Sequence, residues 1–414
     1  RDRPAPADWG LALLPAAVLA WPLLDRAQFP YRAAMPERID LACGVLAILL
    51  VLEAARRTAG WALPLTAAAF VVYAYVGPLF DLVGLSAIAH RGYYPDRLVG
   101  TLFMTLEGIF GVPLEVAATY IILFSIYGAV LEHSGAGRFF IDWSLAAMGR
   151  SRSPAAPGRS VTLAGFLLGT VSGSGVATTV TLGSLAWPLL RRAGYSPDAG
   201  GAVLSAAGIG ALLSPPTLGA AAFLIAEFLN ISYLQVLVMA SIPTVLYYLS
   251  VFLMIEADSR RLGTHAVAVD APSLWTVTRR YGYHFTSLFA IAGLMALGMT
   301  AFRAVFWATL LAVALSFVRR ETALTPRKLL GALEAGGRGV LSVAATTATA
   351  GIIVTLAGGG LFLTVLYAAL AVWVLGLAVP VTASYIIAAV ITAPAMTKLG
   401  IPEYAAHMFI FYYA

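Results

Sequence analysis

Residues 161–190 read VTLAGFLLGTVSGSGVATTVTLGSLAWPLL, an apolar stretch with a polar, glycine-rich interruption at its middle. Five arginines flank it on its two sides, at Arg150, Arg152, Arg159, Arg191 and Arg192. A helix that crosses a membrane in about 20 residues carries positive charge mainly at its cytoplasmic end. Because both ends of this stretch are positive, we expect both to lie in the cytoplasm. The stretch is therefore predicted to fold as a re-entrant hairpin.

The tip of this hairpin, Ser172-Gly173-Ser174-Gly175, is expected to lie at membrane depth. Backbone outside a helix survives there only where it is buried in protein or lines a cavity that binds something polar. The pattern is therefore typical of a transporter. This interpretation as a transporter would be wrong if residues 161–190 formed one uninterrupted membrane span.

Composition sets the class. Hydrophobic residues make up 60% of the chain and charged residues 11%, whereas soluble domains carry roughly 25% charged residues. We therefore expect an all-α polytopic protein in a lipid bilayer, with room for roughly ten to twelve embedded segments. The formal net charge of +6 comes from arginines in short loops, as the positive-inside rule expects. No nucleic-acid partner is expected.

The chain divides into apolar segments joined by charged loops. They are expected at residues 9–24, 41–52, 61–79, 116–131, 139–148, 234–255, 285–300 and 305–318. Residues 80–113 mix charges with apolar residues and are interpreted as interfacial helices that join two modules. A long helix at 199–229 is predicted to break at Ser214-Pro215-Pro216, because two prolines remove two backbone donors and clash with the preceding turn.

The sequence contains an internal repeat. When the chain is aligned with itself at an offset of 206 residues, Pro188 aligns with Pro394 and Gly194 with Gly400. The first tip then falls on residues 378–381, and two arms at 361–377 and 382–397 flank this second tip. Arginines bracket the first hairpin, whereas no charged residue occurs between Gly339 and Thr397. Similar sequence with opposite flanking charge predicts an inverted repeat with one hairpin opening to each side.

The two breaks are candidate binding sites. Exposed backbone carbonyls and nearby hydroxyls suit a small hard cation such as Na⁺, and half-helix N-termini suit a substrate carboxylate. The alternative is that glycine and serine only allow close helix packing. Proline breaks, positive flanks and the repeat together favour binding. Glu227 and Glu256 lie near segment ends, so they are interpreted as interfacial.

The sequence lacks the motifs expected of a membrane enzyme. The sequence has no HExxH motif. An intramembrane serine protease would need glycine two places before Ser174, where Ser172 stands, and the core segments offer no pair of buried aspartates. The five histidines show no ligand spacing, and Cys43 is the only cysteine. We expect no catalytic residues, no cofactor and no transition-metal site.

The chain resembles the permeases of TRAP transporters, of the fused type that joins the small and large membrane subunits. The resemblance runs from about residue 41 to 414 and is strongest in these stretches: LEAARRTAGWALP (52–64), EGIFGVPLEVAATYIILFSIYGAVLEHSGAGRFFID (107–142), GTVSGSGVA (169–177), GYSPDAGGAV (194–203), SPPTLGAAAFLIAEF (214–228), GLAVPVTASYI (376–386) and EYAAHMFIFYYA (403–414). It implies a small-subunit-like region with connecting interfacial helices at 1–106 and a DctM-like large-subunit region at 107–414. Because the chain begins at Arg1 and ends inside an apolar run, we expect a fragment that lacks both ends.

The resemblance also implies a function. It implies an inverted-repeat, elevator-type symporter in the bacterial inner membrane, with two re-entrant hairpins and broken helices. Such a protein imports a small organic anion, here expected to be a carboxylate, with Na⁺ and a periplasmic solute-binding protein of the TAXI type. Two alternatives stay open: a proton-coupled or binding-protein-independent carrier of related fold, and a membrane scaffold subunit that does not transport.

Carried over residue by residue, the resemblance implies two ion and substrate sites. The first is expected at Ser172, Gly173, Ser174, Thr178, Gly208, Ser214, Pro215 and Thr217. The second is expected at Gly376, Pro380, Thr382 and Ser384. Some side-chain oxygens of the family pattern are missing here, since Leu204 replaces an acidic residue and 208–212 replaces a polar run. Ion identity and stoichiometry therefore stay open.

Overall fold

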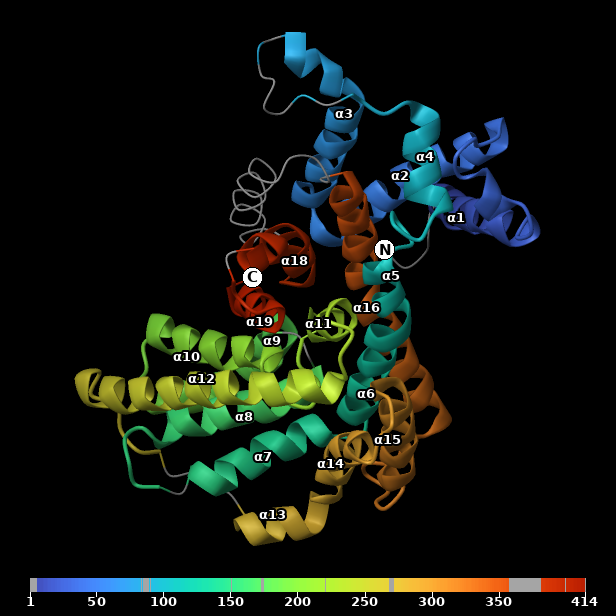
Figure 1. The fold of residues 1–414 in the computed structure, drawn as a ribbon. Helices are drawn as coiled ribbons and strands as arrows, with labels where there is room; N and C mark the ends of the chain where they lie inside the picture. Colours follow the sequence, from blue (N-terminus) through green and yellow to red (C-terminus); the bar gives the residue numbers. More distant parts are fainter. Residues whose placement is uncertain are drawn as a thin grey trace. The chain divides into compact units, whose positions relative to one another are not determined.

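The computed structural model describes residues 6–82, 84, 89, 91–149, 151–172, 175–219, 221–267, 272–356, 381–398 and 400–413 (Figure 1). Within these ranges every regular element is a helix. The predicted all-α class is confirmed. The chain forms two compact units, one of Arg1–Ala118 with Leu341–Ala414 and the other of Thr119–Val340. The domain boundary expected after residue 106 stays a prediction.

The first unit holds both ends of the chain. Its helices are α1 (Pro6–Leu24), η1 (Phe29–Arg32), α2 (Arg38–Ala59), α3 (Ala62–Leu82), α4 (Pro95–Met104), α5 (Val112–Val116), α18 (Val381–Lys398) and α19 (Glu403–Tyr413). The helix α16 (Pro326–Leu356) begins in the second unit and ends in the first, and the π-helical turn η2 (Ala117–Ile121) lies at the other boundary.

The second unit holds the predicted hairpin and broken helix. Its helices are α6 (Ile122–His133), α7 (Ala136–Met148), α8 (Ala156–Ser172), α9 (Gly175–Arg192), α10 (Pro197–Ile209), η3 (Gly210–Leu212), α11 (Ala221–Phe228), α12 (Tyr233–Arg261), α13 (Leu274–Tyr281), α14 (Tyr283–Ala296) and α15 (Ala301–Ser316).

Four helical stretches among the described residues are long and apolar enough to cross a membrane: Ala62–Phe80, Val112–His133, Tyr233–Arg261 and Pro326–Leu356. The last of these, α16, is absent from the predicted segments, because its first half mixes glycines with Glu334 and Arg338. The charged connection between the segments predicted at 234–255 and 285–300 also contains a helix, α13, which carries Arg279 and Arg280 in its last turn. Its N-cap is Ser273, whose hydroxyl accepts a hydrogen bond from the Thr276 amide at 3.2 Å.

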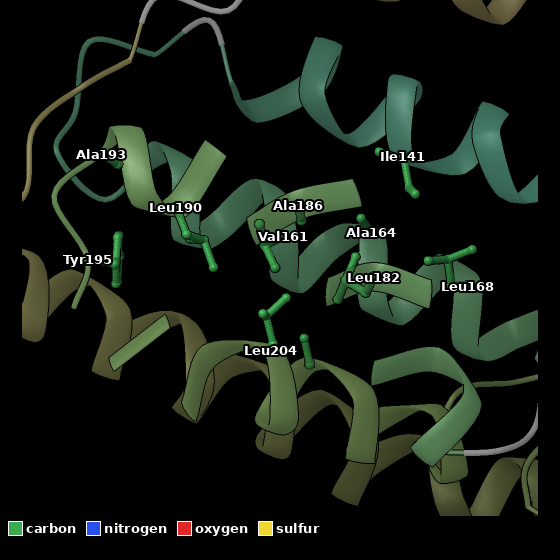
Figure 2. Close-up of a cluster of buried hydrophobic side chains, with 11 residues drawn as sticks. Ile141, Val161, Ala164, Leu168, Leu182, Ala186, Leu190, Ala193, Tyr195 and Leu204 are labelled. Carbon is green, nitrogen blue, oxygen red and sulfur yellow. The ribbon is translucent and has the colours of Figure 1, made fainter. Parts of the chain in front are cut away.

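The stretch at 161–190 is not one helix. The arms α8 and α9 pack against each other and against α10, and residues 173–174 at the tip lie outside the described ranges. Leu182, Ala186 and Leu190 repeat every four residues on α9 and so share one face. Figure 2 shows this face meeting Val161 and Leu168 of α8 and Leu204 of α10. The predicted interruption is confirmed, and burial of these side chains holds the two arms together.

The long helix expected at 199–229 is also broken where predicted. Its first half, α10, ends at Ile209 and continues as the 3₁₀ turn η3, and its second half, α11, begins at Ala221. The segment between them contains Ser214, Pro215 and Pro216, and the Pro215–Pro216 peptide bond is cis. The structure therefore places irregular backbone between two apolar half-helices.

The 206-residue repeat is present in the backbone. The helix α9 covers Gly175–Arg192 and α18 covers Val381–Lys398, so that both are 18 residues long and begin at equivalent positions. Each carries an internal proline, Pro188 or Pro394. The following helices also begin at equivalent positions, α10 at Pro197 and α19 at Glu403.

The turns between these helices match as well. Gly194 and Gly400 have φ values of 89° and 84°, a left-handed conformation that favours glycine. The Gly194 amide donates to the Arg191 carbonyl, and the Gly400 amide donates in the same way to Thr397. The repeat is therefore confirmed for these segments. The inverted orientation of the two copies stays a prediction, and the first arm predicted for the second hairpin, 361–377, lies outside the described residues.

A buried carboxylate organises the start of the first unit. Asp40, in the first turn of α2, is fully buried and precedes the apolar part of that helix. Its oxygens accept hydrogen bonds from Trp21 Nε1 at 2.8 Å, Arg32 Nε at 3.1 Å and the Glu37 amide at 3.0 Å. Arg32 also pairs with Asp25 at 2.6 Å. This cluster ties α1, η1 and α2 together.

Candidate ion and substrate site

The last turn of α8 lies directly on the broken helix. A Cβ atom added to Gly169 would lie 2.5 Å from the Ala211 Cα and 3.0 Å from the Ser214 Oγ. One turn earlier, a Cβ on Gly165 would lie 2.7 Å from the Ala207 carbonyl oxygen. Only glycine fits at such separations, so the glycines of α8 allow the end of the hairpin arm to contact the break.

Thr217 joins the break to the end of α8. Its side chain is buried, and its Oγ1 donates to the Thr170 carbonyl at 2.8 Å and lies 3.3 Å from the Gly169 carbonyl. The last four carbonyls of a helix have no partner within the helix, and Gly169 and Thr170 belong to the last four residues of α8. Thr217 therefore caps α8 from the other side of the break.

The break itself is held by α12. Four hydroxyl contacts reach the interrupted chain: Tyr233 to the Pro216 carbonyl at 3.1 Å, Thr244 to the Leu213 carbonyl at 2.8 Å, Tyr247 to the Ala206 carbonyl at 2.6 Å, and Tyr248 to the Ser214 hydroxyl at 3.0 Å. A buried carbonyl without a donor is costly, so these hydroxyls stabilise the break. The sequence interpretation misses this role of α12. The sequence feature that could have indicated this role is the group of hydroxyl side chains Thr244, Tyr247 and Tyr248 within an otherwise apolar span.

Ser214 lies at the centre of this arrangement. It is fully buried, and its Oγ donates to the Gly210 carbonyl at 2.8 Å. Gly208 lies beside the start of α9, because a Cβ added to it would collide with the Thr179 Oγ1. The structure thus brings Gly208, Ser214 and Thr217 against both arms of the first hairpin. The tip residues Gly173 and Ser174 are outside the described ranges, and Ser172 ends α8.

Thr178 faces a different environment. It is buried and lines a cavity of about 330 Å³ formed by α6, α8, α9 and α16. Ser125, Thr181 and the exposed Glu132 supply the other polar groups of the lining, and the remaining lining residues are small or apolar. The residues predicted for the first site therefore divide into two groups, one at the break and one at this cavity.

The second predicted site is described only in part. Gly376 and Pro380 lie outside the described residues, whereas Thr382 and Ser384 lie on α18 and are buried. Among the described atoms, the Ser384 hydroxyl has no hydrogen-bond partner. A buried hydroxyl of this kind fits a bound ion or water. Under the 206-residue shift Ser384 is equivalent to Thr178, so both copies bury a hydroxyl at this position.

The two carboxylates interpreted as interfacial lie away from the break. Glu256 pairs with Arg159 at 3.6 Å, which places it at the arginine-rich end of the hairpin. Glu227 is exposed near the end of α11. Neither carboxylate contributes to the cluster around Ser214.

Replacing Thr217 by valine is expected to weaken the join between α8 and the break. The change keeps the shape of the side chain but leaves the Thr170 and Gly169 carbonyls without this donor, at a cost of about 1–3 kcal/mol. Thermal unfolding in detergent measures the effect. Thr309→Val is the matched control, because Thr309 bonds only within its own helix, to the Val305 carbonyl. Equal losses in the two variants would contradict the capping role.

Comparison with known proteins gives one family. The family model described as "Tripartite ATP-independent periplasmic transporter, DctM component" matches residues 46–414. No curated protein matches the chain.

Proposed function

The chain belongs to the DctM component family of tripartite ATP-independent periplasmic transporters, and on that premise we propose that it is the membrane permease of a Na⁺-coupled importer. Membership of the family implies secondary transport of organic acids together with a periplasmic binding protein. The protein is a multi-pass membrane protein. We place it in the bacterial inner membrane, with a small organic carboxylate as its cargo and a TAXI-type binding protein as its partner.

The observation that carries this proposal is the assembly of buried polar groups around Ser214. Irregular backbone is tolerated inside a membrane only where protein covers it or where it lines a binding cavity. Here Thr217, Tyr248 and the carbonyls of two helix ends supply neutral oxygens within apolar elements. Neutral oxygens are the ligands that hard cations such as Na⁺ accept, which supports a cation site at the first hairpin.

The cavity beside Thr178 supports an anionic substrate. Small-molecule sites typically have volumes of about 300–1,000 Å³, and this cavity of about 330 Å³ lies in that range. Ala177 and Thr178 of its lining belong to the first turn of α9, where the helix dipole favours a carboxylate. Glu132 opposes an anion, and Na⁺ that enters with the substrate would offset this repulsion.

We also propose an elevator mechanism, based on the first hairpin, the broken helix and α12. The hairpin, the broken helix and α12 form one connected group that would carry ion and substrate together. The second hairpin and its broken helix would belong to the same mobile transport domain. The helices outside these two repeats would form the scaffold, with the small-subunit-like region as its extension.

Uptake into proteoliposomes tests the proposal. We expect uptake of a labelled organic acid to require both Na⁺, varied at fixed pH, and the binding protein. Ser174→Leu at the tip is expected to reduce uptake at least about tenfold, the loss that corresponds to about 1.4 kcal/mol. Ser184→Leu is the matched control, because Ser184 is exposed on α9, an arm of the same hairpin.

The alternatives give different outcomes in the same assay. Uptake that needs no Na⁺ but follows a pH gradient indicates a proton-coupled carrier, and uptake without the binding protein indicates an independent carrier. A non-transporting scaffold subunit predicts that Ser174→Leu leaves uptake by the complete system intact.

A further inference from the structure

Two buried polar side chains join the helices of the second repeat. The Tyr385 hydroxyl on α18 and the His407 Nδ1 on α19 lie 2.8 Å apart and form a hydrogen bond. Tyr385 is fully buried and His407 is 6% exposed. The ring of Phe411 packs edge-on against Tyr385, with the centroids 6.4 Å apart. The imidazole therefore belongs to a buried aromatic cluster with Tyr385 and Phe411.

The charge around this pair is sparse. No charged residue occurs in the chain between Gly339 and Thr397. Within the described parts of α18 and α19, the ionisable groups besides His407 are Lys398 at the end of α18, the exposed Glu403 one turn before His407, and the tyrosines Tyr385, Tyr404, Tyr412 and Tyr413. Imidazole is the side chain that normally changes charge between about pH 5 and 8. Ionisable residues inside membrane segments are costly and mark ion pathways and proton relays.

The first repeat shows that the fold does not need this pair. Under the 206-residue shift Tyr385 is equivalent to Thr179, and His407 is equivalent to Gly201. Thr179 donates to the Gly175 carbonyl of its own helix at 2.8 Å. A Cβ added to Gly201 would meet nothing within 4 Å. Since α9 and α10 adopt the same backbone without a buried histidine, packing alone does not account for His407.

We propose that His407, held by Tyr385, is a proton-binding site that takes up one proton in each transport cycle. This inference rests on the proposed transport function and adds a second coupled ion at the second repeat. A neutral imidazole carries a proton on only one of its two ring nitrogens. A proton from water forms an N–H bond on the other nitrogen, and the imidazole gains one positive charge. The phenol hydroxyl both donates and accepts, so the hydrogen bond to Tyr385 survives in either protonation state.

The pH dependence of uptake tests the site. Na⁺ and substrate are held constant, and the pH is set equal inside and outside the proteoliposomes. The wild type is expected to change its uptake by about tenfold over two pH units, whereas His407→Gln changes by less than about twofold, because one titrating group can change its occupancy at most tenfold per unit. An imposed alkaline interior should accelerate uptake only in the wild type. Tyr385→Phe should keep a pH profile, shifted along the axis, because the imidazole remains.

The control is His265→Gln, since His265 is exposed in a loop and should behave as the wild type. Proton binding is measured independently from the pH dependence of thermal unfolding in detergent, where the difference between the wild type and His407→Gln must vary with pH. A pH-independent difference, or identical uptake profiles of the two proteins, would overturn the proposal. Absence of uptake by the wild type at every pH would instead contradict the transport function, while the unfolding measurement still decides whether His407 binds a proton.

Discussion

Gly169→Leu is expected to abolish uptake and to lower the thermal stability of the permease. Even a single Cβ atom at this position would lie 2.5 Å from the Ala211 Cα, and backbone cannot move aside as a flexible side chain can. Overpacking of a well-packed core typically costs about 1–3 kcal/mol and sometimes more. We expect the upper end here, because the change separates α8 from η3 and removes Thr217 from the carbonyls that it caps. Uptake and thermal unfolding in detergent both report the effect.

Gly201→Leu is the matched control for this experiment. Gly201 lies on α10 of the same unit, and a Cβ atom there meets nothing within 4 Å. Loss of function in the Gly169 variant with retention in the Gly201 variant would show that the contact, not the loss of glycine, matters. If both variants transport equally well, the end of α8 does not rest on the break.

Asp40→Asn is expected to produce the second large effect, on stability. Removing one partner of a buried ion pair typically lowers the free energy of unfolding by about 3–5 kcal/mol. Asp40 is fully buried and bonded to Arg32 and Trp21. We expect about 3 kcal/mol, because Arg32 keeps its pair with Asp25. Thermal unfolding in detergent measures the loss. Asp142→Asn is the control, since Asp142 pairs with Arg138 at 4.0 Å with both side chains exposed; a loss as large there would show that the Asp40 cluster is not special.

The stability difference between the wild type and Asp40→Asn is also expected to depend on pH. Burial by itself raises the pKa of Asp40, but hydrogen bonds from Arg32, Trp21 and the Glu37 amide outweigh it and hold the pKa below its usual value. A carboxyl group whose pKa is lowered by folding stabilises the protein above its unfolded pKa, which is about 3.9. The stability difference between the wild type and Asp40→Asn should therefore be constant near neutral pH and shrink as the pH falls below about 4. A difference that grows on acidification would contradict this account.

The broad arrangement could be predicted because its signals are local. The polar, glycine-rich interruption at 161–190, two adjacent prolines and a repeated Pro–Gly spacing each act through nearby backbone, and the structure shows the two hairpin arms, the broken helix and the turns. The cytoplasmic location of both hairpin ends, expected from the flanking arginines, stays a prediction. The helix α2 extends beyond its predicted segment because Glu53 pairs with Arg56 and Arg57 at its end, so these charges continue the helix instead of ending it.

The candidate site could be predicted only in part, because its geometry depends on contacts between distant residues. The sequence singles out Thr217 as part of the motif at 214–217. Its partner carbonyls could not be predicted, because they lie nearly 50 positions earlier in the chain. The hydroxyls of α12 have only a weak local signal, the hydroxyl side chains Thr244, Tyr247 and Tyr248, since an apolar helix with occasional tyrosines is also an ordinary membrane span. The pair of Tyr385 and His407 has no local signature. The sequence groups Thr178 with Ser214, whereas the structure places Thr178 in the lining of a cavity to which Ser214 does not contribute.

The four hydroxyl contacts between α12 and the break have a mechanical consequence. They are distributed along α12 from Tyr233 to Tyr248, so sliding that helix past the interrupted chain would rupture all of them at once. In the proposed elevator mechanism, α12 would therefore move together with the interrupted chain as one rigid body. In that mechanism, the surface along which this body slides would lie on the side of α12 that faces away from these hydrogen bonds.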